Sequence, residues 1–499
     1  MSGAGEDVLM ISQLSSGHRQ FIPRLGGEII GISQSKSGSF YSLLLSTNNI
    51  KIINVATLEL VSEVSGILCS PPVKKQEDNV MSRFPSVALI RPHHEHLYIS
   101  GTDSSSAMLQ AYSLSLDQQV LRFDVGRLSR VKQTGTRQRP VAEPKVLFAA
   151  FTSDGSWLAT IDKWTDPYAL DEISSPEVML KFWGWDGKNW DVVTKIESPH
   201  GLCDALGLGS PRRVSVKQEF ATLGADGRVK FWRPIKRPSS SDVVWSLDRI
   251  VGSSSPTLHL EGALVYSNDG SILAAAIGNE IHIIDMANDH VIKSLYIDLR
   301  VSRMEILGRH LLCLHEKSSI FSGRDITTGE ILFTERLDRP FAALAVDHVT
   351  STFALATASF PIGISKNKPS KLSKSTIVVS RIVSESKVDE AHISLDSVVV
   401  TLLGAVPPEL VSGFIFIDDS GEIGFVGQNP ITIKASDGHA RSIDASFPTS
   451  ITQGGERKVT EIKHQPTLTY ASLGELHTIF EANRGLDLTH IYETIVQNL

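Results

Sequence analysis

The sequence predicts an all-β protein in which repeated four-stranded units close into a ring. Short segments of alternating Val, Ile, Leu and Phe are separated by Gly, Asn, Asp and Ser, and helical spacing appears only near the end of the chain. The stretches 153–160 and 268–275 share an Asp-Gly turn that leads into an apolar strand. A second unit, a turn followed by a strand with the pattern x-Val/Ile-x-Phe/Ile-Trp/Ile, recurs at intervals of about 50 residues. Since one such unit cannot bury both of its faces, the repeats predict a WD40-type β-propeller of seven or eight blades.

The composition supports a large folded protein. Of the 499 residues, 41% are hydrophobic and 21% charged, which excludes a chain that is disordered throughout. No apolar run approaches the roughly 20 residues that a membrane-spanning helix needs, and the first residues lack the features of a secretory signal. Cys69, Cys203 and Cys313 are too widely spaced for a disulfide framework or a zinc site, which predicts a reducing compartment, the cytosol or the nucleus.

The repeats divide the chain into blades, loops and flanking segments. We expect blades at 26–66, 84–125, 145–197, 199–252, 258–298, 301–340, 341–384 and 392–434. Polar, proline-rich or basic stretches at 67–83, 126–144, 164–177 and 362–376 are expected to be loops on this scaffold. Residues 84–434 then form the propeller, whereas residues 1–66 either end a preceding propeller or add an extra blade.

The last part of the chain changes its period. Residues 435–471 have no clear pattern and are expected to be a linker, and a capping-box pattern at 472–475 begins a helical tail over 472–499. Its second helix carries an apolar stripe made of Leu488, Ile491, Tyr492, Ile495, Val496 and Leu499. Because short helices are marginal alone in water, this stripe must be covered, either by the chain's own propeller or by another subunit.

The motifs of catalysis and cofactor binding are missing. The sequence has no P-loop, no GxGxxG that opens a helix, no HExxH and no GxSxG, so we expect no catalytic residues, no cofactor, no small-molecule substrate and no membrane association. The stretch 93–96 is rich in histidine, but neighbouring side chains on a strand point to opposite faces, and we expect a solvated loop without a metal. The tryptophans of 183–190 could stack on bases. Packing between blades is the more usual role, and we expect Trp232 to be buried in the same way, with Asp226 holding a turn.

Three basic tracts lie in a chain whose net charge is −7. They span 127–145, 205–240 and 348–384, and each has a clear excess of Lys and Arg over Asp and Glu. Such tracts are often solvated loops, but three of them on an acidic chain favour a polyanion, which would be held through its phosphates with little sequence preference. The expected RNA-backbone contacts are Arg127, Arg130, Lys132, Arg137, Arg139, Arg212, Arg213, Lys366, Lys368, Lys371 and Lys374.

Short segments in a fixed order carry a family resemblance. Residues 20–26 read QFIPRLG, and the further segments are 157–160, 180–183, 198–200, 221–227, 230–232 and 250–253. Together they resemble the U3 small nucleolar RNA-associated WD-repeat proteins of the UTP-A (t-UTP) subcomplex of the small-subunit processome. Members of that family carry a further propeller before a Phe-Leu-Pro-Arg-Leu-Gly segment. The resemblance therefore implies that this chain is the C-terminal part, with residues 1–66 as the end of the first propeller. One blade and a fragment cannot close a ring, so the alternative is that they join the second ring as an eighth blade.

The resemblance also implies a function in the nucleolus. We expect a non-catalytic scaffold that acts in early 18S pre-rRNA processing, ribosome biogenesis and the linked pre-rRNA transcription. Its implied partners are the other UTP-A subunits, the 5′ region of the pre-rRNA and the U3 small nucleolar ribonucleoprotein, with the helical tail making subunit contacts. The alternative is a propeller adaptor that binds peptide motifs in another multiprotein complex, which would need a specific pocket at the centre of the ring rather than basic loops.

Overall fold

Alternation of apolar and polar residues drives the chain into short strands, each paired mainly with its neighbour along the sequence. The computed structural model describes residues 8–67, 87–126, 144–165, 176–252, 261–359, 374–427, 432–434, 440–442 and 462–464, apart from short gaps at 14, 28, 46–48, 102–106, 115–117, 214–217, 237–241, 316–318, 338–340, 384–385, 405–412 and 419–420. These described residues form strands and turns without a helix, and so include no helix that could cross a membrane.

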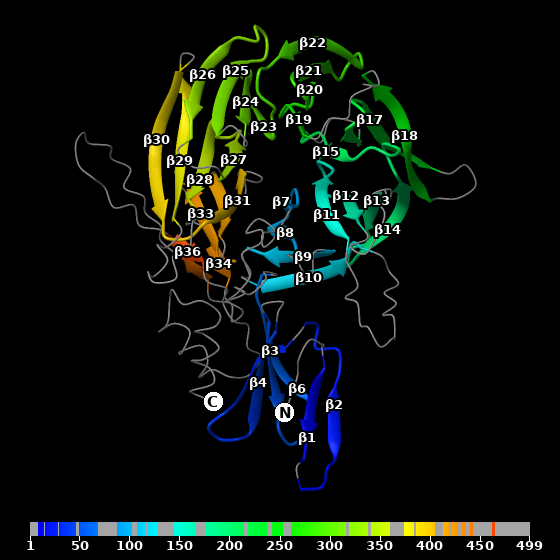
Figure 1. Ribbon diagram of the computed structural model, residues 1–499, viewed down its shortest axis with the longest axis vertical. Helices are drawn as coiled ribbons and strands as arrows, with labels where there is room; N and C mark the ends of the chain where they lie inside the picture. Colours follow the sequence, from blue (N-terminus) through cyan, green and yellow to red (C-terminus); the bar gives the residue numbers. More distant parts are fainter. Residues whose placement is uncertain are drawn as a thin grey trace, which may run out of the picture.

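Seven four-stranded antiparallel sheets of the described chain form a ring (Figure 1). In each sheet the first strand lies nearest the centre of the ring and the last strand lies at its rim. The sheets are β7–β10 (Ala88–Ile90, His96–Ser100, Met108–Ser113, Gln118–Asp124), β11–β14 (Lys145–Phe151, Trp157–Trp164, Glu177–Trp185, Trp190–Glu197), β15–β18 (Ala205–Gly209, Phe220–Gly224, Val229–Lys236, Val243–Val251), β19–β22 (Gly262–Tyr266, Ile272–Ile277, Glu280–Asp285, His290–Tyr296), β23–β26 (Arg303–Leu307, His310–His315, Ile320–Asp325, Ile331–Arg336), β27–β30 (Phe341–Asp347, Thr352–Ser359, Lys374–Val383, Ser386–Leu395) and β31–β32–β33–β36 (Val399–Gly404, Gly413–Asp418, Ile423–Gly427, Ile462–His464).

Apolar clusters between neighbouring sheets hold the ring together. Within the described chain, seven buried clusters fill the seven interfaces in turn. The ring closes where Ile417 of β32 and Phe425 of β33 pack with Leu97 and Ile99 of β8. Each fully buried aliphatic or aromatic side chain contributes roughly 1.5–3 kcal/mol, and a blade whose faces are both covered by neighbours collects this on two sides. The predicted all-β propeller is confirmed.

The first 65 residues build a separate unit outside the ring (Figure 1). A hairpin of β1 (Leu9–Ser12) and β2 (Arg19–Ile22) packs on the sheet β3–β6 (Ile29–Gln34, Phe40–Leu45, Asn49–Asn54, Leu60–Ser65) through a core that includes Leu9, Leu43 and Ile53. Side chains of the ring reach this unit at two points: Gln110 Nε2 donates to the carbonyl of Gly66 at 2.6 Å, and Arg122 Nη2 to that of Gly26 at 3.2 Å. The sheet β3–β6 is therefore not inserted into the ring as an eighth blade.

The boundary between the last two blades differs from the expected one. The blade expected to end at 384 continues to Leu395, because β30 pairs with β29 along its whole length, and the next sheet begins at Val399 rather than at 392. Strand β30 lies at the rim, so most of its residues are exposed or half-buried. Its polar sequence resembles a loop for that reason.

The expected linker 435–471 also contributes to the sheets. Strand β36 (Ile462–His464) pairs with β33 and completes the last blade, and β35 (Ala440–Ser442) pairs with β34 (Thr432–Lys434). Strands of three residues are too short to show a period of two, which is why the sequence pattern missed them. The helical tail 472–499 lies outside the described residues.

Candidate binding site at the centre of the ring

The seven innermost strands line a central channel with a cavity of about 710 Å³. Small residues keep it open, among them Ala149, Gly209 and Ala345, and apolar side chains such as Leu89 and Leu403 form much of its wall. One glycine is required by close packing: a Cβ at Gly404 would collide with the carbonyl oxygen of Val346 on the adjacent innermost strand. The first strands thus approach one another closely enough to seal the wall while leaving space along the axis.

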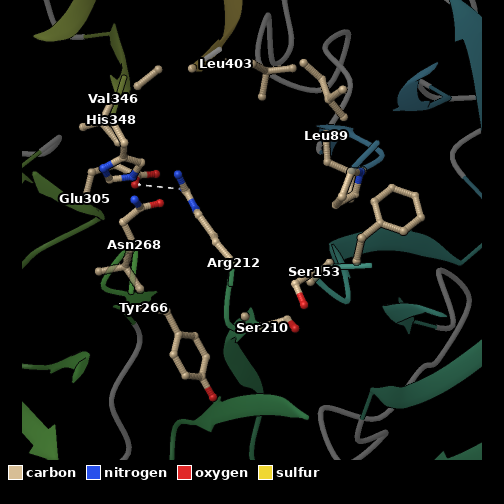
Figure 2. A pocket seen from close by; sticks show the side chains of 18 of the residues that line it. Leu89, Ser153, Ser210, Arg212, Tyr266, Asn268, Glu305, Val346, His348 and Leu403 are labelled. Atoms are coloured by element: carbon tan, nitrogen blue, oxygen red, sulfur yellow. Dashed lines mark hydrogen bonds and ion pairs between the residues drawn. The ribbon is translucent and has the colours of Figure 1, made fainter. Parts of the chain in front are cut away.

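Polar side chains gather at one end of the channel, which we call the Arg212 mouth and define by Arg212, Asn268, Glu305, His348 and Val349. Each except Glu305 follows the last residue of an innermost strand, where the chain turns back toward the second strand. Figure 2 shows Arg212 extending across the channel from the side of Ser210 toward Glu305 and His348. Four different blades therefore supply this mouth.

One ion pair organises the Arg212 mouth. Arg212 Nη2 donates to Glu305 Oε2 at 3.3 Å, with side-chain exposures of 45% and 24%. Burial raises the pKa of the Glu305 carboxyl, and the charge of Arg212 opposes that rise. Burial, and then the Arg212 charge, lowers the pKa of His348 to about 4, so this imidazole is neutral at physiological pH. The mouth thus offers one guanidinium, one carboxylate and neutral hydrogen-bonding groups.

Most of the hydrogen-bonding capacity at this mouth is unused inside the described chain. A guanidinium has five N–H donors, and Glu305 accepts from one of them. Among the described residues, the Asn268 amide and the His348 ring have no hydrogen-bond partner. These groups can therefore bind an incoming acceptor or donor without first breaking several internal bonds.

A second charged cluster lies behind the channel wall and is saturated. Glu219 is 2% exposed; its carboxylate accepts hydrogen bonds from Arg233 (3.2 Å), Arg249 (3.1 Å) and the hydroxyl of Tyr266 (3.1 Å). The Arg249 guanidinium also lies 4.0 Å from the centre of the Phe231 ring. Burial, followed by the neighbouring carboxylate, raises the pKa of Tyr266 well above its ordinary value. A buried charge with this many partners joins the blades β15–β18 and β19–β22, and we assign it no ligand.

The structure places three of the residues expected to contact RNA. Arg212 faces the channel, Arg213 is exposed beside it, and Lys374 is 60% exposed at the start of β29, 3.1 Å from Asp396. The others, and the tail residues expected to contact subunits, lie outside the described residues: Arg127, Arg130, Lys132, Arg137, Arg139, Lys366, Lys368, Lys371, Leu488, Ile491, Tyr492, Ile495, Val496 and Leu499.

The two aromatic and histidine-rich motifs have structural surroundings. Trp183 and Trp190 are each 5% exposed and pack between blades, as predicted, and Trp190 Nε1 donates to the Tyr98 hydroxyl at 3.0 Å. No group of three or more His, Cys, Asp or Glu side chains among the described residues could hold a metal. Of the Arg212 mouth, sequence reasoning missed Asn268, Glu305 and His348. A usable signal was their position within two residues of the innermost strands, which becomes readable once the blades are placed.

Comparisons with known proteins agree with this architecture. Residues 88–307 match the family model of the WD repeat-containing protein 75 second β-propeller. Over 307 residues the chain is 28% identical to U3 small nucleolar RNA-associated protein 17 of Schizosaccharomyces pombe, with 57% of this chain and 38% of that protein covered. NET1-associated nuclear protein 1 of Saccharomyces cerevisiae is 25% identical over 330 residues (57% and 36% covered), and human WD repeat-containing protein 75 is 28% identical over 295 residues (57% and 32% covered).

These matches confirm the resemblance to U3-associated WD-repeat proteins that the short sequence segments indicated. The matched segments span little more than a third of the length of each of these relatives. The residues that match the family model comprise four complete sheets of the ring and the first strand of the fifth.

Proposed function

We propose that this chain, a relative of U3 small nucleolar RNA-associated protein 17 and WD repeat-containing protein 75, is a non-catalytic scaffold subunit of the small-subunit processome. It would act in early 18S pre-rRNA processing, in ribosome biogenesis and in the linked pre-rRNA transcription. The observation that carries the proposal is that the family match falls on the closed ring, the part of the chain best suited to hold partners. The printed names of the relatives, one U3-associated and one nuclear, support work in the nucleus and nucleolus.

The ring suits scaffolding for a physical reason. Its blades are fixed on both sides by buried clusters, while the connections between strands can vary without disturbing the core. Partners would be the other UTP-A subunits, the pre-rRNA 5′ region and the U3 small nucleolar ribonucleoprotein. In this proposal, residues 1–66 continue a preceding propeller and 472–499 pack with the tails of sibling subunits.

For RNA, we propose contacts to phosphates by the basic tracts at 127–145 and 348–384 together with Arg213. The exposure of Lys374 and Arg213 supports this, because both can meet a polyanion without being unburied. We leave Arg212 out of this set, since its guanidinium faces the channel and Glu305 rather than the outer surface.

Affinity purification of the full chain from growing cells, followed by mass spectrometry and RNA sequencing, tests the proposal. We expect processome proteins, U3 RNA and pre-rRNA to co-purify. Recovery of a vesicle coat or a ubiquitin ligase without these RNAs would instead support the adaptor alternative.

Deletion of 472–499 tests the proposed subunit contact of the tail. We expect the melting midpoint of the ring to stay nearly unchanged while the sibling subunits no longer co-purify, because the tail would be covered by those subunits and not by its own propeller. A truncated protein that loses substantial stability yet still recovers the complex would place the tail on its own ring.

A further inference from the structure

The Arg212 mouth has the chemistry of a peptide-binding site. We infer that it binds an extended segment of a partner protein, with a Glu or Asp carboxylate on the Arg212 guanidinium and an apolar neighbour on Val349. The inference goes beyond the proposed scaffold role and does not depend on it, because it would hold equally if the chain served another assembly.

The guanidinium provides the first argument. Arg212 is held by one hydrogen bond of 3.3 Å to Glu305, and its side chain stays 45% exposed inside the mouth. A planar guanidinium can bind a second carboxylate in a bidentate way while keeping the first, and such charge-assisted bonds are roughly twice as strong as neutral ones. Asn268 and His348 stand beside it with free hydrogen-bonding groups that suit the amides of an extended backbone.

The apolar surface provides the second argument. Val349 lies at the mouth and is 65% exposed, an unusual position for an apolar side chain beside so many polar ones. Below it the channel wall is formed by Leu89, Leu264, Val346 and Leu403. A cavity of about 710 Å³ with apolar walls and a few convergent polar groups falls in the size range of typical ligand sites, roughly 300–1,000 Å³.

The same features disfavour single-stranded RNA at this place. RNA-binding grooves stack bases on exposed aromatic rings and run several cations along the backbone. The aromatic residues of this wall, Phe151 and Tyr266, are 8% and 3% exposed, so neither offers a ring face to a base. Arg212 is the single cation among the described residues that line the cavity, and Glu305 lies next to it.

A pooled binding experiment with the purified full chain tests the inference. One pool of short bead-displayed peptides carries a fixed Glu with randomised flanks, and the matched pool carries Gln at that position. We expect the Glu pool to be enriched about tenfold or more, with Leu, Val or Ile selected next to the Glu. Equal recovery of the two pools would overturn the inference.

Substitutions at the mouth should change affinity in opposite directions. For a selected peptide, Arg212→Gln should weaken binding about tenfold or more, whereas Glu305→Gln should strengthen it about two- to fivefold by removing the competing carboxylate. Arg213→Gln removes the same charge one residue along and should change affinity less than twofold. Melting midpoints of the three variants confirm that each is folded.

Two results would contradict the assignment. If Arg213→Gln weakens binding as much as Arg212→Gln, the attraction is a general charge effect and not a site. If Arg212→Gln leaves peptide binding intact but abolishes binding of labelled oligouridine, the mouth is an RNA site and the peptide assignment is wrong.

Discussion

Trp232 shows how a single residue connects a sequence repeat to the stability of the ring. It is 4% exposed, and its Nε1 donates to Thr222 Oγ1 at 3.0 Å. Since that hydroxyl accepts from Trp232, its own proton is available to His200 Nε2 at 2.9 Å, which leaves the Nδ1–H of His200 to donate to Asp226 at 3.1 Å. The chain of hydrogen bonds fixes the loop that enters the blade, the second strand and the turn at Asp226 relative to one another.

Replacing Trp232 should therefore destabilise the ring strongly. We expect Trp232→Ala to lower the free energy of unfolding by roughly 3–5 kcal/mol, as large-to-small changes in a core do. Trp232→Phe, which keeps most of the packing but loses the hydrogen bond, should cost less. Denaturant unfolding measures both, and an unshifted midpoint for Trp232→Ala would contradict the packing described for this blade.

Asp226 should make its contribution dependent on pH. Burial acts to raise the pKa of this carboxyl, but hydrogen bonds and charge from His200 outweigh burial, so the pKa lies below its ordinary value. A depressed pKa stabilises the fold above the unfolded pKa, near 3.9, and the stabilisation is lost as the pH falls through the folded value. The stability difference between the wild type and Asp226→Asn should be constant around neutral pH and should shrink below about pH 4. A difference that grows on acidification would show the opposite sign of coupling.

At the scale of elements, the two repeated Asp-Gly-Ser turns have almost the same internal bonds. Asp154 accepts from Thr152 Oγ1 at 2.6 Å and from the backbone N–H of Ser156 at 3.1 Å, and Asp269 accepts from Ser267 and Ser271 at the same distances. The sequence repeat predicted these turns because the bonds are local. It could not reveal that Gln218 Nε2, from the next blade, also donates to Asp154 at 2.7 Å.

The extra bond predicts unequal costs for two equal substitutions. Asp154→Ala should destabilise the protein by about 1 kcal/mol more than Asp269→Ala, because it also breaks the contact between blades. In a double-mutant cycle, Asp154 and Gln218 should couple, whereas Asp269 and Gln218 should add independently. Equal losses for the two alanine variants, measured by chemical unfolding, would mean that the Gln218 bond adds nothing.

Inner and outer elements differ in how well their sequences reveal them. Strand β20 is buried at five of its six positions and stands out as an apolar run. The rim strand β30 and the three-residue strand β36 carry no such signal, so the expected boundaries at 384, 392 and 435 were wrong. Burial on both faces produces a readable pattern, and exposure at the rim removes it.

At the scale of the whole molecule, repetition predicted the ring but not its centre. Seven interfaces of similar construction follow from the periodic apolar strands. The Arg212 mouth instead depends on residues that are far apart in sequence, such as Arg212 and His348, and become neighbours only because the ring closes. No local pattern can signal a contact created by closure.

The charge distribution of the whole chain leads to the last prediction, which concerns RNA. The net charge is −7, so general attraction to a polyanion should be weak, and binding should come from the basic tracts alone. The logarithm of the affinity for single-stranded RNA should fall linearly with the logarithm of the salt concentration, and by a similar amount for unrelated sequences. The test variant replaces six residues by Ser: Arg137, Arg139, Lys366, Lys368, Lys371 and Lys374.

The size of the change in salt dependence counts the phosphates that are contacted. Each lost contact should reduce the slope by about 0.7, so that six contacts would reduce it by about 4. A matched control removes six exposed charges of the ring by substitution to Ser: Lys188, Lys195, Lys236, Arg300, Arg303 and Arg336. Because net charge changes equally in both variants, a slope that falls only in the first assigns binding to the tracts. Equal slopes in the two variants, or unchanged crosslinking to pre-rRNA in the first, would show that the tracts are solvated loops.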